Sequence, residues 1–468
     1  MKLSVIGAGY VGLTTAGCLA HIGHDVFCSE SDVQKLATLQ HGGMPIFEPH
    51  LENVIRSSRQ ANRLHFGCTE DAIAWGDAIF ICVGTPPLPN GDADLHAIEA
   101  VARTIAKRAS GYRLVIEKST VPVQTGAQLR RHLAVHQSQQ LSYEVASNPE
   151  FLREGSSVED FLHPDRIVIG VESARAAEML RQIYRPILEQ EFTCPVHSNC
   201  AKQKSPVFFL TDTNSAELIK HASNSFLAMK ISFINMVANL CELVGADVTR
   251  VAQGMGLDPR IGAAFLNPGI GFGGFCFPKD VQAFIRIAQK SGCDFSLLKE
   301  VERINQDRVQ QFVEKLRQEL WVIRGKKIAL LGLAFKPNTD DVRFAPAIEV
   351  TKSLLQEGAE VRAYDPQAMD KAKSLLPDVT YCSDAYDAAD GADAIIIATE
   401  WDEFRQLDWD RLRSNVERPL ILDGRNMLDG AYISGRGFQY ISVGRPTVQP
   451  LQRRFTVNDD QPLAAVHE

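Results

Sequence analysis

Short apolar runs, bounded by glycine, proline and polar residues, recur along the first part of the chain. The runs at 2–6, 24–29, 77–83, 114–116 and 144–146 are predicted to be buried strands, and the stretch 13–22, which Gly23 ends, is predicted to be a helix. Strands buried on both faces and joined by helices are typical of parallel sheets. The pattern therefore predicts a doubly wound α/β domain.

A good helix-forming segment follows, and then the strand pattern starts again. The segment from about Asp212 to Gly245 is predicted to be one helix, long enough to bridge domains. Apolar runs at 327–331, 359–364 and 392–398 then repeat the earlier pattern, and the sequences around 24–27 and 76–81 resemble those around 359–362 and 391–396. The fold is thus predicted to be α/β, with two doubly wound parallel-sheet domains joined by a helical middle.

Composition narrows the class of protein. A length of 468 residues suggests about three domains of roughly 150 residues each. The net charge of −8 gives no support for nucleic-acid binding. The ten cysteines include no Cys-x-x-Cys pair, which argues against a disulfide framework or a zinc site and favours a reducing compartment. No apolar run reaches the roughly 18 residues of a spanning helix. We therefore expect a cytoplasmic protein that binds no metal, membrane or nucleic acid.

A glycine motif lies between the first predicted strand and helix. The first twenty residues could also pass for a signal peptide, but Gly7, Gly9 and Gly12 interrupt them at the spacing G-x-G-x-x-G. A second strand follows and ends in Glu30. This order is typical of a Rossmann dinucleotide site, in which the pyrophosphate lies on the helix N-terminus and the acid binds the ribose. Because a carboxylate repels a 2′-phosphate, Glu30 favours NAD over NADP.

Polar residues follow other strands of the same domain. Thr85 and Thr120 come after predicted strands and should face the cofactor, because ligands lie beyond the carboxyl ends of parallel strands. Glu150 and Glu154 would share one face if their segment were helical. They are candidates for acid–base work. A solvated helix face is the alternative interpretation.

A glycine-rich loop at 267–280 delivers a single thiol, Cys276, followed by Lys279 and Asp280. If a helix begins near Pro278, its dipole and the ammonium of Lys279 should lower the pKa of the thiol and favour a nucleophilic thiolate. The alternative is a turn whose cysteine is a small buried apolar residue.

Two further features bear on function. Lys220 and Asn224 lie one turn apart on the predicted long helix, where they could hold an oxygen or a water, or form an ordinary surface with a snorkelling lysine. The second wound region has Gly332–Asp340 in place of G-x-G-x-x-G, so it should not bind a second dinucleotide. Lys336 in that segment suits a phosphate or sugar in the cleft between domains.

Taken together, these motifs resemble those of the nucleotide-sugar 6-dehydrogenases, the UDP-glucose/GDP-mannose dehydrogenase family, from Met1 to about Arg445. The resemblance is carried by 7–12, Pro45-Ile-Phe-Glu-Pro49, 83–86, Lys118-Ser-Thr-Val-Pro122, 148–155, 276–280 and Phe335-Lys-Pro-Asn-Thr-Asp-Asp341. It implies a NAD-binding Rossmann domain (1–200), a central helical and dimerisation domain that carries Cys276 (201–320), a C-terminal UDP-sugar-binding Rossmann-like domain (321–447) and a tail (448–468), which its polar composition predicts to be disordered.

The resemblance implies a four-electron oxidation, with the UDP-glucose branch as the best match: UDP-glucose becomes UDP-glucuronate through a thiohemiacetal and a thioester on Cys276. The family pattern gives three sets of residues. The catalytic set is Cys276, Lys220, Asn224, Asp280, Glu150 and Thr120. The cofactor set is Gly7, Gly9, Tyr10, Val11, Gly12, Glu30, Lys35, Thr85, Thr120, Glu154, Lys279 and Arg343. The substrate set is Glu150, Phe151, Leu152, Lys220, Asn224, Arg260, Phe265, Asn267, Gly271, Gly273, Phe335 and Lys336, with Arg260 reaching the neighbouring subunit.

Three departures from the family pattern leave alternatives open. Phe275 precedes the thiol where a small residue is usual, Glu30 replaces the usual aspartate, and the segment 194–209 is longer than usual and has no assigned role. The same chemistry on GDP-mannose or a UDP-N-acetylhexosamine is one alternative. A catalytically silent nucleotide-sugar-binding protein, made possible by Phe275, is another.

Overall fold

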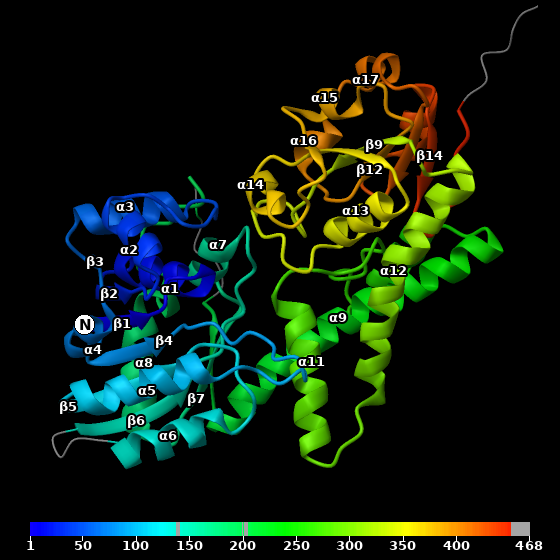
Figure 1. Ribbon diagram of the computed structural model, residues 1–468. Helices are drawn as coiled ribbons and strands as arrows, with labels where there is room; N and C mark the ends of the chain where they lie inside the picture. Colours follow the sequence, from blue (N-terminus) through cyan, green and yellow to red (C-terminus); the bar gives the residue numbers. More distant parts are fainter. Residues whose placement is uncertain (137–140, 199, 201–204, 451–468) are drawn as a thin grey trace, which may run out of the picture.

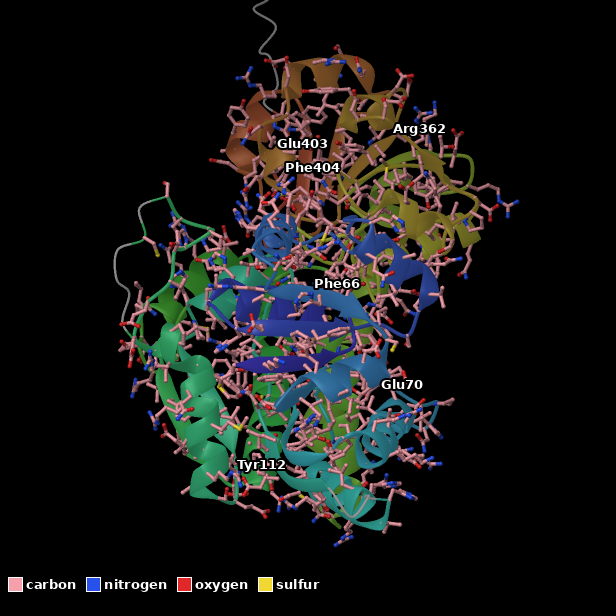
Figure 2. The ribbon with its side chains drawn as sticks, turned by 90° about the vertical axis from the view of Figure 1, so that its left-hand side faces the viewer. Phe66, Glu70, Tyr112, Arg362, Glu403 and Phe404 are labelled. Atoms are coloured by element: carbon pink, nitrogen blue, oxygen red, sulfur yellow. The ribbon has the colours of Figure 1, made fainter. Side chains whose placement is uncertain are left out.

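The computed structural model describes residues 1–136, 141–198, 200 and 205–450. Two α/β bodies flank a group of long helices, and α9 (Thr213–Val244) runs from the first body to the second (Figure 1). Figure 2 shows both bodies filled with side chains, with Phe66 and Tyr112 in the first and Arg362 and Phe404 in the second. The predicted α/β class with two wound domains and a helical middle is confirmed.

The first body is an eight-stranded sheet in the order β3-β2-β1-β4-β5-β6-β7-β8. Neighbouring strands are parallel, except that β7 is antiparallel to β6. The strands are β1 (Lys2–Ile6), β2 (Asp25–Ser29), β3 (Leu64–Gly67), β4 (Ala78–Ile81), β5 (Gly111–Glu117), β6 (Leu141–Ser147), β7 (Arg166–Gly170) and β8 (Val207–Thr211). The sheet thus continues past residue 200, where the sequence placed the end of this domain.

Helices cover both faces of this sheet. One apolar core lies beneath α1 (Tyr10–His21), α3 (Leu51–Gln60), α7 (Ser157–Leu162) and α8 (Ala174–Leu188). The other lies beneath α4 (Thr69–Trp75), α5 (His96–Arg108) and α6 (Thr125–His136), and α2 (Val33–Gln40) follows β2. Two covered faces explain the continuous apolar runs of the strands.

The segment that carries Glu150 and Glu154 is not helical, so the prediction that both acids share one helix face is wrong. The Glu150 carboxylate instead accepts the Leu152 N–H at 2.6 Å, and the segment ends at Gly155, whose φ is +83°. Helix α7 begins only at Ser157. The two carboxylates are therefore free to point to different partners.

The helical middle contains α9, α10 (Val248–Gly256), α11 (Cys276–Lys290) and α12 (Ser296–Leu320). The Asp212 carboxylate caps α9 by accepting from the Ser215 backbone N–H at 2.8 Å, and Gly245 ends the helix. Both ends agree with the predicted central helix. Among the described residues, α9 alone is long and apolar enough to cross a membrane, a test that core helices of soluble proteins also meet.

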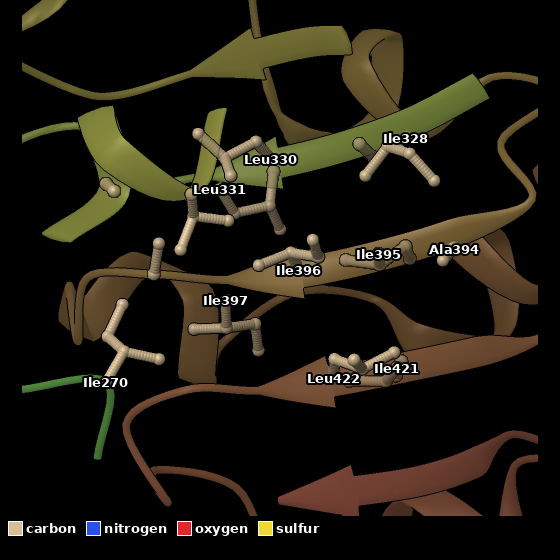
Figure 3. Close-up of a cluster of buried hydrophobic side chains, with 14 of the residues drawn as sticks. Ile270, Ile328, Leu330, Leu331, Ala394, Ile395, Ile396, Ile397, Ile421 and Leu422 are labelled. Atoms are coloured by element: carbon tan, nitrogen blue, oxygen red, sulfur yellow. The ribbon is translucent and has the colours of Figure 1, made fainter. Parts of the chain in front are cut away.

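The second body is a parallel six-stranded sheet in the order β11-β10-β9-β12-β13-β14. Its strands are β9 (Lys327–Leu331), β10 (Glu360–Tyr364), β11 (Thr380–Tyr381), β12 (Ala394–Ile397), β13 (Leu420–Asp423) and β14 (Gln439–Ser442). Its helices are α13 (Pro346–Gln356), α14 (Met369–Lys373), α15 (Ala385–Ala389), α16 (Asp402–Arg405), α17 (Trp409–Asn415) and α18 (Gly430–Gly435). Ile270, from the glycine-rich loop, joins the core of this sheet beside Ile397 (Figure 3).

The predicted tail, 448–468, begins with an ordered residue. Val448 and Tyr440 exchange two backbone hydrogen bonds of 2.9 Å. Residues 451–468 lie outside the described part of the chain.

Candidate active site

The first strand, β1, is followed by a loop that leaves open space in front of Gly9. Gly7 has a φ of +103° and donates its N–H to the Ser29 carbonyl at 2.9 Å. A side chain at Gly12 would collide with the Gly7 carbonyl, whereas one at Gly9 would meet no atom within 4 Å. Helix α1 starts at Tyr10 rather than at Leu13, so Tyr10 and Val11 form its first turn. The space before Gly9 therefore faces free backbone N–H groups, which suits a pyrophosphate.

Glu30 lies at the carboxyl end of β2, beside this loop. One of its carboxylate oxygens accepts the Ala8 N–H at 3.2 Å, and the other accepts the N–H groups of Ser31 and Asp32 at 2.7 and 2.9 Å. These bonds orient the carboxylate and leave it acceptor capacity. Lys35 is exposed in the first turn of α2. The structure thus brings Glu30 to the loop where a dinucleotide ribose would lie.

Thr85 and Thr120 meet beyond the ends of β4 and β5. The Thr85 hydroxyl donates to the Thr120 carbonyl at 2.8 Å. Thr85 is buried, and Thr120 is half-buried. A side chain at the neighbouring Gly84 would meet no atom within 4 Å, so this strand end also borders open space.

A polar cluster surrounds Cys276, the first residue of α11. The Lys220 ammonium lies 2.9 Å from a Glu150 carboxylate oxygen. The Asp280 carboxylate accepts from the Asn224 amide and from the Lys279 ammonium, both at 2.6 Å. These groups come from α9, α11 and the extended segment after β6, and all except Cys276 are buried. Lys220 and Asn224 thus face the interior, not solvent.

The charges in this cluster stabilise one another. Burial alone would lower the pKa of Lys220, but Glu150, Cys276 and Asp280 raise it above its ordinary value. Burial alone would raise the pKa of Asp280, but Lys279, His221 and Lys220 hold it below its ordinary value. The cluster therefore keeps an ammonium and a carboxylate ionised inside the protein.

The prediction of a lowered thiol pKa is wrong for this state of the protein. Burial, followed by the charge of Glu150, raises the pKa of the Cys276 thiol to about 12, and Lys220 opposes them only in part. The helix begins at Cys276 and not near Pro278. A proton acceptor or an added positive charge is needed to form the thiolate.

Glu154 points to the second wound domain. Burial and the nearby charge of Asp341 raise its pKa to about 8, although Arg343 opposes them. Its carboxylate oxygens lie 3.5 Å from the Thr339 hydroxyl and from the Arg343 guanidinium. Arg343 is held by Asp341 at 2.7 Å. Glu154 therefore lies at the junction of the two domains, apart from the ion pair of Glu150.

Phe275, the unusual residue before the thiol, packs against two cations. The Arg343 guanidinium lies 4.4 Å from its ring centroid, and the Lys279 ammonium lies 5.7 Å from it. Such contacts are attractive because the ring face is electron-rich. The bulky ring is thus accommodated between residues of the candidate site.

The glycine-rich loop is fastened to the second domain by its backbone. The Arg425 guanidinium donates to the carbonyls of Gly271 and Phe335 at 3.2 and 3.1 Å. A side chain at Gly273 would collide with Phe344 and Pro346, and one at Gly274 would come within 2.7 Å of the Phe335 ring. The glycines therefore permit the loop to pack closely against the second domain.

Other expected substrate residues are spread more widely. The Phe151 ring lies 5.3 Å from the Lys220 ammonium, and Leu152 donates its N–H to Glu150 at 2.6 Å. Lys336 is half-buried, and burial lowers its pKa. Phe265 has a φ of +64°, and its ring packs 6.0 Å from Phe277. Asn267 is exposed, and Arg260 is 87% exposed and pairs with Asp258.

Sequence reasoning missed several residues that hold the site. The Glu48 carboxylate accepts the N–H groups of Gly155 and Ser157, both at 2.8 Å, and so fixes the end of the segment that carries Glu150. The Tyr10 hydroxyl donates to Asp340 of the second domain, which also pairs with Lys371 at 2.7 Å. Glu48 and Asp340 lie within motifs recognised in the sequence, but nothing local reveals their distant partners.

A cavity of about 430 Å³ opens at this junction. It is lined by the segment from Met44 to Asn53 and by Asp340. It therefore joins the Glu48 segment to the second domain.

Comparison with known proteins finds three domain profiles in chain order. The UDP-glucose/GDP-mannose dehydrogenase family matches through its NAD-binding domain over residues 1–188, its central domain over 214–307 and its UDP-binding domain over 329–430.

Individual relatives match over nearly the whole chain. UDP-glucose 6-dehydrogenase of Rhizobium meliloti is 46% identical over 453 residues, covering 95% of this chain and 100% of that protein. UDP-glucose 6-dehydrogenase TuaD of Bacillus subtilis is 42% identical over 452 residues, covering 96% and 94%. Among solved structures, a UDP-glucose dehydrogenase from Pyrobaculum islandicum has a TM-score of 0.83 at 41% identity, covering 91% and 94%. A UDP-D-ManNAc dehydrogenase from Pyrococcus horikoshii has a TM-score of 0.80 at 27% identity, covering 95% and 99%.

Proposed function

The chain belongs to the UDP-glucose/GDP-mannose dehydrogenase family, and from this premise we propose that it oxidises the C6 alcohol of UDP-glucose to UDP-glucuronate. It is a NAD-dependent dehydrogenase. The substrate is proposed from the relatives that are named UDP-glucose 6-dehydrogenase and share 41–46% of their residues with this chain. The reaction consumes one UDP-glucose, two NAD⁺ and one water, and yields UDP-glucuronate, two NADH and three protons.

The cofactor fits the first domain on structural grounds. The open space before Gly9, the free N-terminus of α1 and the oriented carboxylate of Glu30 suit a pyrophosphate and a ribose diol. Bound NAD⁺ supplies the acceptor for two successive hydrides and a positively charged ring. We assign Lys35, Thr85, Thr120 and Glu154 to the same site, with Arg343 approaching from the second domain and Lys279 from α11.

In the first oxidation, we assign the Lys220–Glu150 pair to the C6 oxygen. Glu150 accepts the proton of the alcohol, directly or through water, as the hydride leaves C6. The Lys220 ammonium stabilises the negative charge that develops on oxygen, and burial strengthens this attraction because it excludes water. Asn224 also binds that oxygen. The Asp280 carboxylate orients the Asn224 amide through their 2.6 Å hydrogen bond.

The thiol of Cys276 then takes up the aldehyde. Its sulfur bonds to C6, and its proton is transferred to the oxygen, which gives a thiohemiacetal beside Lys220. Loss of the second hydride from C6, to a second NAD⁺, and of the hydroxyl proton, to water, would give a thioester. The raised pKa of the free thiol favours the protonated form of Cys276 before substrate binds. This limits oxidation of the thiol between turnovers.

Water completes the reaction. We assign Glu150, with Thr120 and Asp280, to the positioning and deprotonation of a water that attacks the thioester carbon. The carbon–sulfur bond breaks, the thiol is re-formed and the carboxylate leaves. The sugar is held by the loop of Phe265, Asn267, Gly271 and Gly273, by Phe151 and Leu152, and by Phe335 and Lys336 of the UDP-binding domain.

One observation carries this proposal: Cys276 lies beside a buried Lys220–Glu150 ion pair, where the NAD-binding domain, the helical middle and the UDP-binding domain meet. The test is stoichiometry. Each UDP-glucuronate should be accompanied by two NADH, measured by absorbance and chromatography on one sample. Cys276→Ala should form no acid, whereas the exposed control Cys293→Ala should keep its activity. One NADH per product, or normal acid formation by Cys276→Ala, would rule out the thioester route.

The choice of sugar is tested with a panel. NADH formation should be fastest with UDP-glucose and slower with GDP-mannose and UDP-N-acetylhexosamines. Faster NADH formation with another sugar would mean that this sugar is the substrate, while the proposed two-step oxidation would still apply. No NADH with any of them would indicate a silent binding protein.

We further propose that α9 forms the interface of a homodimer or larger assembly. Several of its large apolar side chains are exposed at helical spacing, including Phe226 and Leu240 at 58% and Phe233 at 53%. An exposed apolar face of this kind marks an interaction site. Arg260 could then reach the site of the partner. Light scattering should show at least a dimer, and Phe226→Glu together with Phe233→Glu should yield monomers. A monomeric native protein would contradict the proposal.

We also place the protein in the cytoplasm. All ten cysteines lie among the described residues and are free, which suits a reducing compartment. Recovery of the enzyme in a membrane or periplasmic fraction would contradict this location.

A further inference from the structure

Two histidines and two cysteines without a role in the proposed reaction converge in the NAD-binding domain. His163 directly follows α7, and Cys194, His197 and Cys200 lie in the connection between α8 and β8. One donor atom of each side chain lies within 4.8 Å of the donor atoms of the other three, and all four residues are half-buried. Thiolate and imidazole are the ligands that zinc prefers in structural sites.

The separations of these donor atoms match a tetrahedral metal site. The His163 Nε2 atom lies 3.3 Å from the Cys194 sulfur and 3.5 Å from the Cys200 sulfur. The His197 Nδ1 atom lies 3.5 and 3.9 Å from the same two sulfurs. Zn–S bonds of about 2.3 Å and Zn–N bonds of about 2.0–2.1 Å at tetrahedral angles give a sulfur–nitrogen separation of about 3.6 Å. Each imidazole therefore faces both sulfurs at the required spacing.

Neighbouring groups orient two of these residues. The second ring nitrogen of His197, Nε2, lies 3.3 Å from a Glu159 carboxylate oxygen. Such a carboxylate fixes the ring tautomer and makes a ligating histidine more basic. The Cys194 sulfur also accepts the backbone N–H of His197 at 3.3 Å. Metal sites in proteins commonly have an outer shell of this kind.

We propose that His163, Cys194, His197 and Cys200 bind one Zn²⁺ in a structural site. Binding releases two thiol protons, and the two thiolates neutralise the ion, so no oxidation is involved. Four protein ligands fill a tetrahedral shell and leave no position for substrate, which distinguishes a structural from a catalytic zinc. Two sulfurs with two imidazoles favour zinc over magnesium or calcium.

The site would tie the α8–β8 connection to the end of α7. The other end of α7 is already fastened, because Glu48 binds the Ser157 N–H and the Ser157 hydroxyl lies 2.8 Å from that of Thr14 in α1. Zinc binding by Cys194, His197 and Cys200 would thereby give a structural role to the segment 194–209, to which the sequence assigned none. The expectation that the chain binds no zinc rested on the lack of Cys-x-x-Cys pairs, whereas the spacing here is Cys-x-x-His-x-x-Cys with a distant fourth ligand.

Metal analysis of the full-length protein, purified under reducing conditions and supplied with Zn²⁺ before gel filtration, tests the site. We expect about one zinc per chain by mass spectrometry. The double variant Cys194→Ser with Cys200→Ser should retain less than about a tenth of it, and the matched control Cys68→Ser with Cys293→Ser, which changes two exposed cysteines, should retain all of it. Equal zinc in the first variant and the native protein, or no zinc in the native protein, would overturn the proposal.

Cobalt gives a readout that does not depend on how well a variant folds. Native protein loaded with Co²⁺ should show the intense visible absorption of a tetrahedral, thiolate-bound ion. The weak spectrum of an octahedral ion, or a Cys194–Cys200 disulfide in the reduced preparation, would overturn the proposal. Glu159→Gln should keep the tetrahedral spectrum and weaken Zn²⁺ binding about 10–100-fold. Unchanged affinity would overturn the role given to Glu159.

Discussion

Both wound domains end their first strand at a glycine in the left-handed region, Gly7 after β1 (φ +103°) and Gly332 after β9 (φ +98°). In each domain this glycine donates its N–H to the end of the neighbouring strand, to Ser29 at 2.9 Å and to Tyr364 at 2.8 Å. Six adjacent strands of the first sheet, in the order β3-β2-β1-β4-β5-β6, also correspond in order to the six strands of the second sheet. The two domains thus share the turn that a dinucleotide site uses.

The two domains differ in the segment that comes after this turn. After Gly7 a helix begins at Tyr10, whereas after Gly332 the next helix begins only at Pro346. Glu30 remains half-buried at the loop, but its counterpart Asp365 is fully buried and accepts from five donors, namely the backbone N–H groups of Leu333, Ala334, Gln367 and Ala368 and the indole of Trp401. A shared topology therefore does not make a cofactor site. The site also needs a helix N-terminus and an available carboxylate.

The largest effect should come from filling the open space in front of Gly9 in the first domain. Gly9→Val places its side chain in open space, so folding should be preserved, but the side chain occupies the approach of the pyrophosphate. We expect kcat/KM for NAD⁺ to fall by ~10²-fold or more with little change in Tm. Gly435→Val, also in open space but in the second domain, is the control and should be neutral. Unchanged NAD⁺ kinetics in Gly9→Val would place the cofactor elsewhere.

Cofactor preference tests the carboxylate of the first domain directly. NAD⁺ should exceed NADP⁺ in kcat/KM by at least ~10²-fold, because Glu30 and the nearby Asp32 repel a 2′-phosphate. Glu30→Ala should narrow this ratio, mainly by weakening the use of NAD⁺. Initial rates with both cofactors provide the measurement. Equal use of the two cofactors by the native enzyme would show that Glu30 does not bind the ribose.

Replacing the carboxylates of Asp365 and Glu30 by amides should distinguish a residue that stabilises the fold from one that binds the cofactor. Asp365→Asn replaces an acceptor oxygen with a donor NH₂ among buried donors, and should cost about 2–4 kcal/mol of unfolding free energy. Glu30→Gln should cost less than about 0.5 kcal/mol, because its site is partly exposed, and should instead raise the KM for NAD⁺. Urea unfolding monitored by circular dichroism measures both. Similar stability losses in the two variants would mean that the carboxylates are equivalent.

The smallest effect concerns Glu154, which joins the two domains. Its pKa is raised to about 8 in the folded protein from an ordinary value of 4.5, so the folded state binds more protons between these values. Its contribution to stability is therefore complete below about pH 4.5 and is lost as the pH rises through about 8. Relative to Glu154→Gln, the native protein should lose unfolding free energy across this window, because its folded state holds the Glu154 proton more tightly than its unfolded state does. If the unfolding free energies of the two proteins changed in the same way with pH, the raised pKa of Glu154 would be contradicted.

Features that depend on neighbouring residues could be predicted from the sequence. Apolar runs located β1, β2, β4, β5 and β6 of the first sheet and β9, β10 and β12 of the second, but not the other strands. Asp212 and Gly245 marked the cap and the end of α9 to within one residue. The spacing of Gly7, Gly9 and Gly12 predicted the loop, since a tight turn and close packing of a helix on a strand impose it locally. The helical spacing of Lys220 and Asn224 predicted that both lie on one face of α9, and the structure shows that this face is buried.

Features that depend on distant partners came only from the folded structure. Glu150 and Glu154 are four residues apart, yet one pairs with Lys220 of α9 and the other faces Arg343 of the second domain. The thiol pKa rises because of burial and because of carboxylates that come from other segments, above all Glu150. His163 joins Cys194 across the first domain. Burial and charge act through space, so the sequence supplied the chemical groups and the fold decided which of them meet.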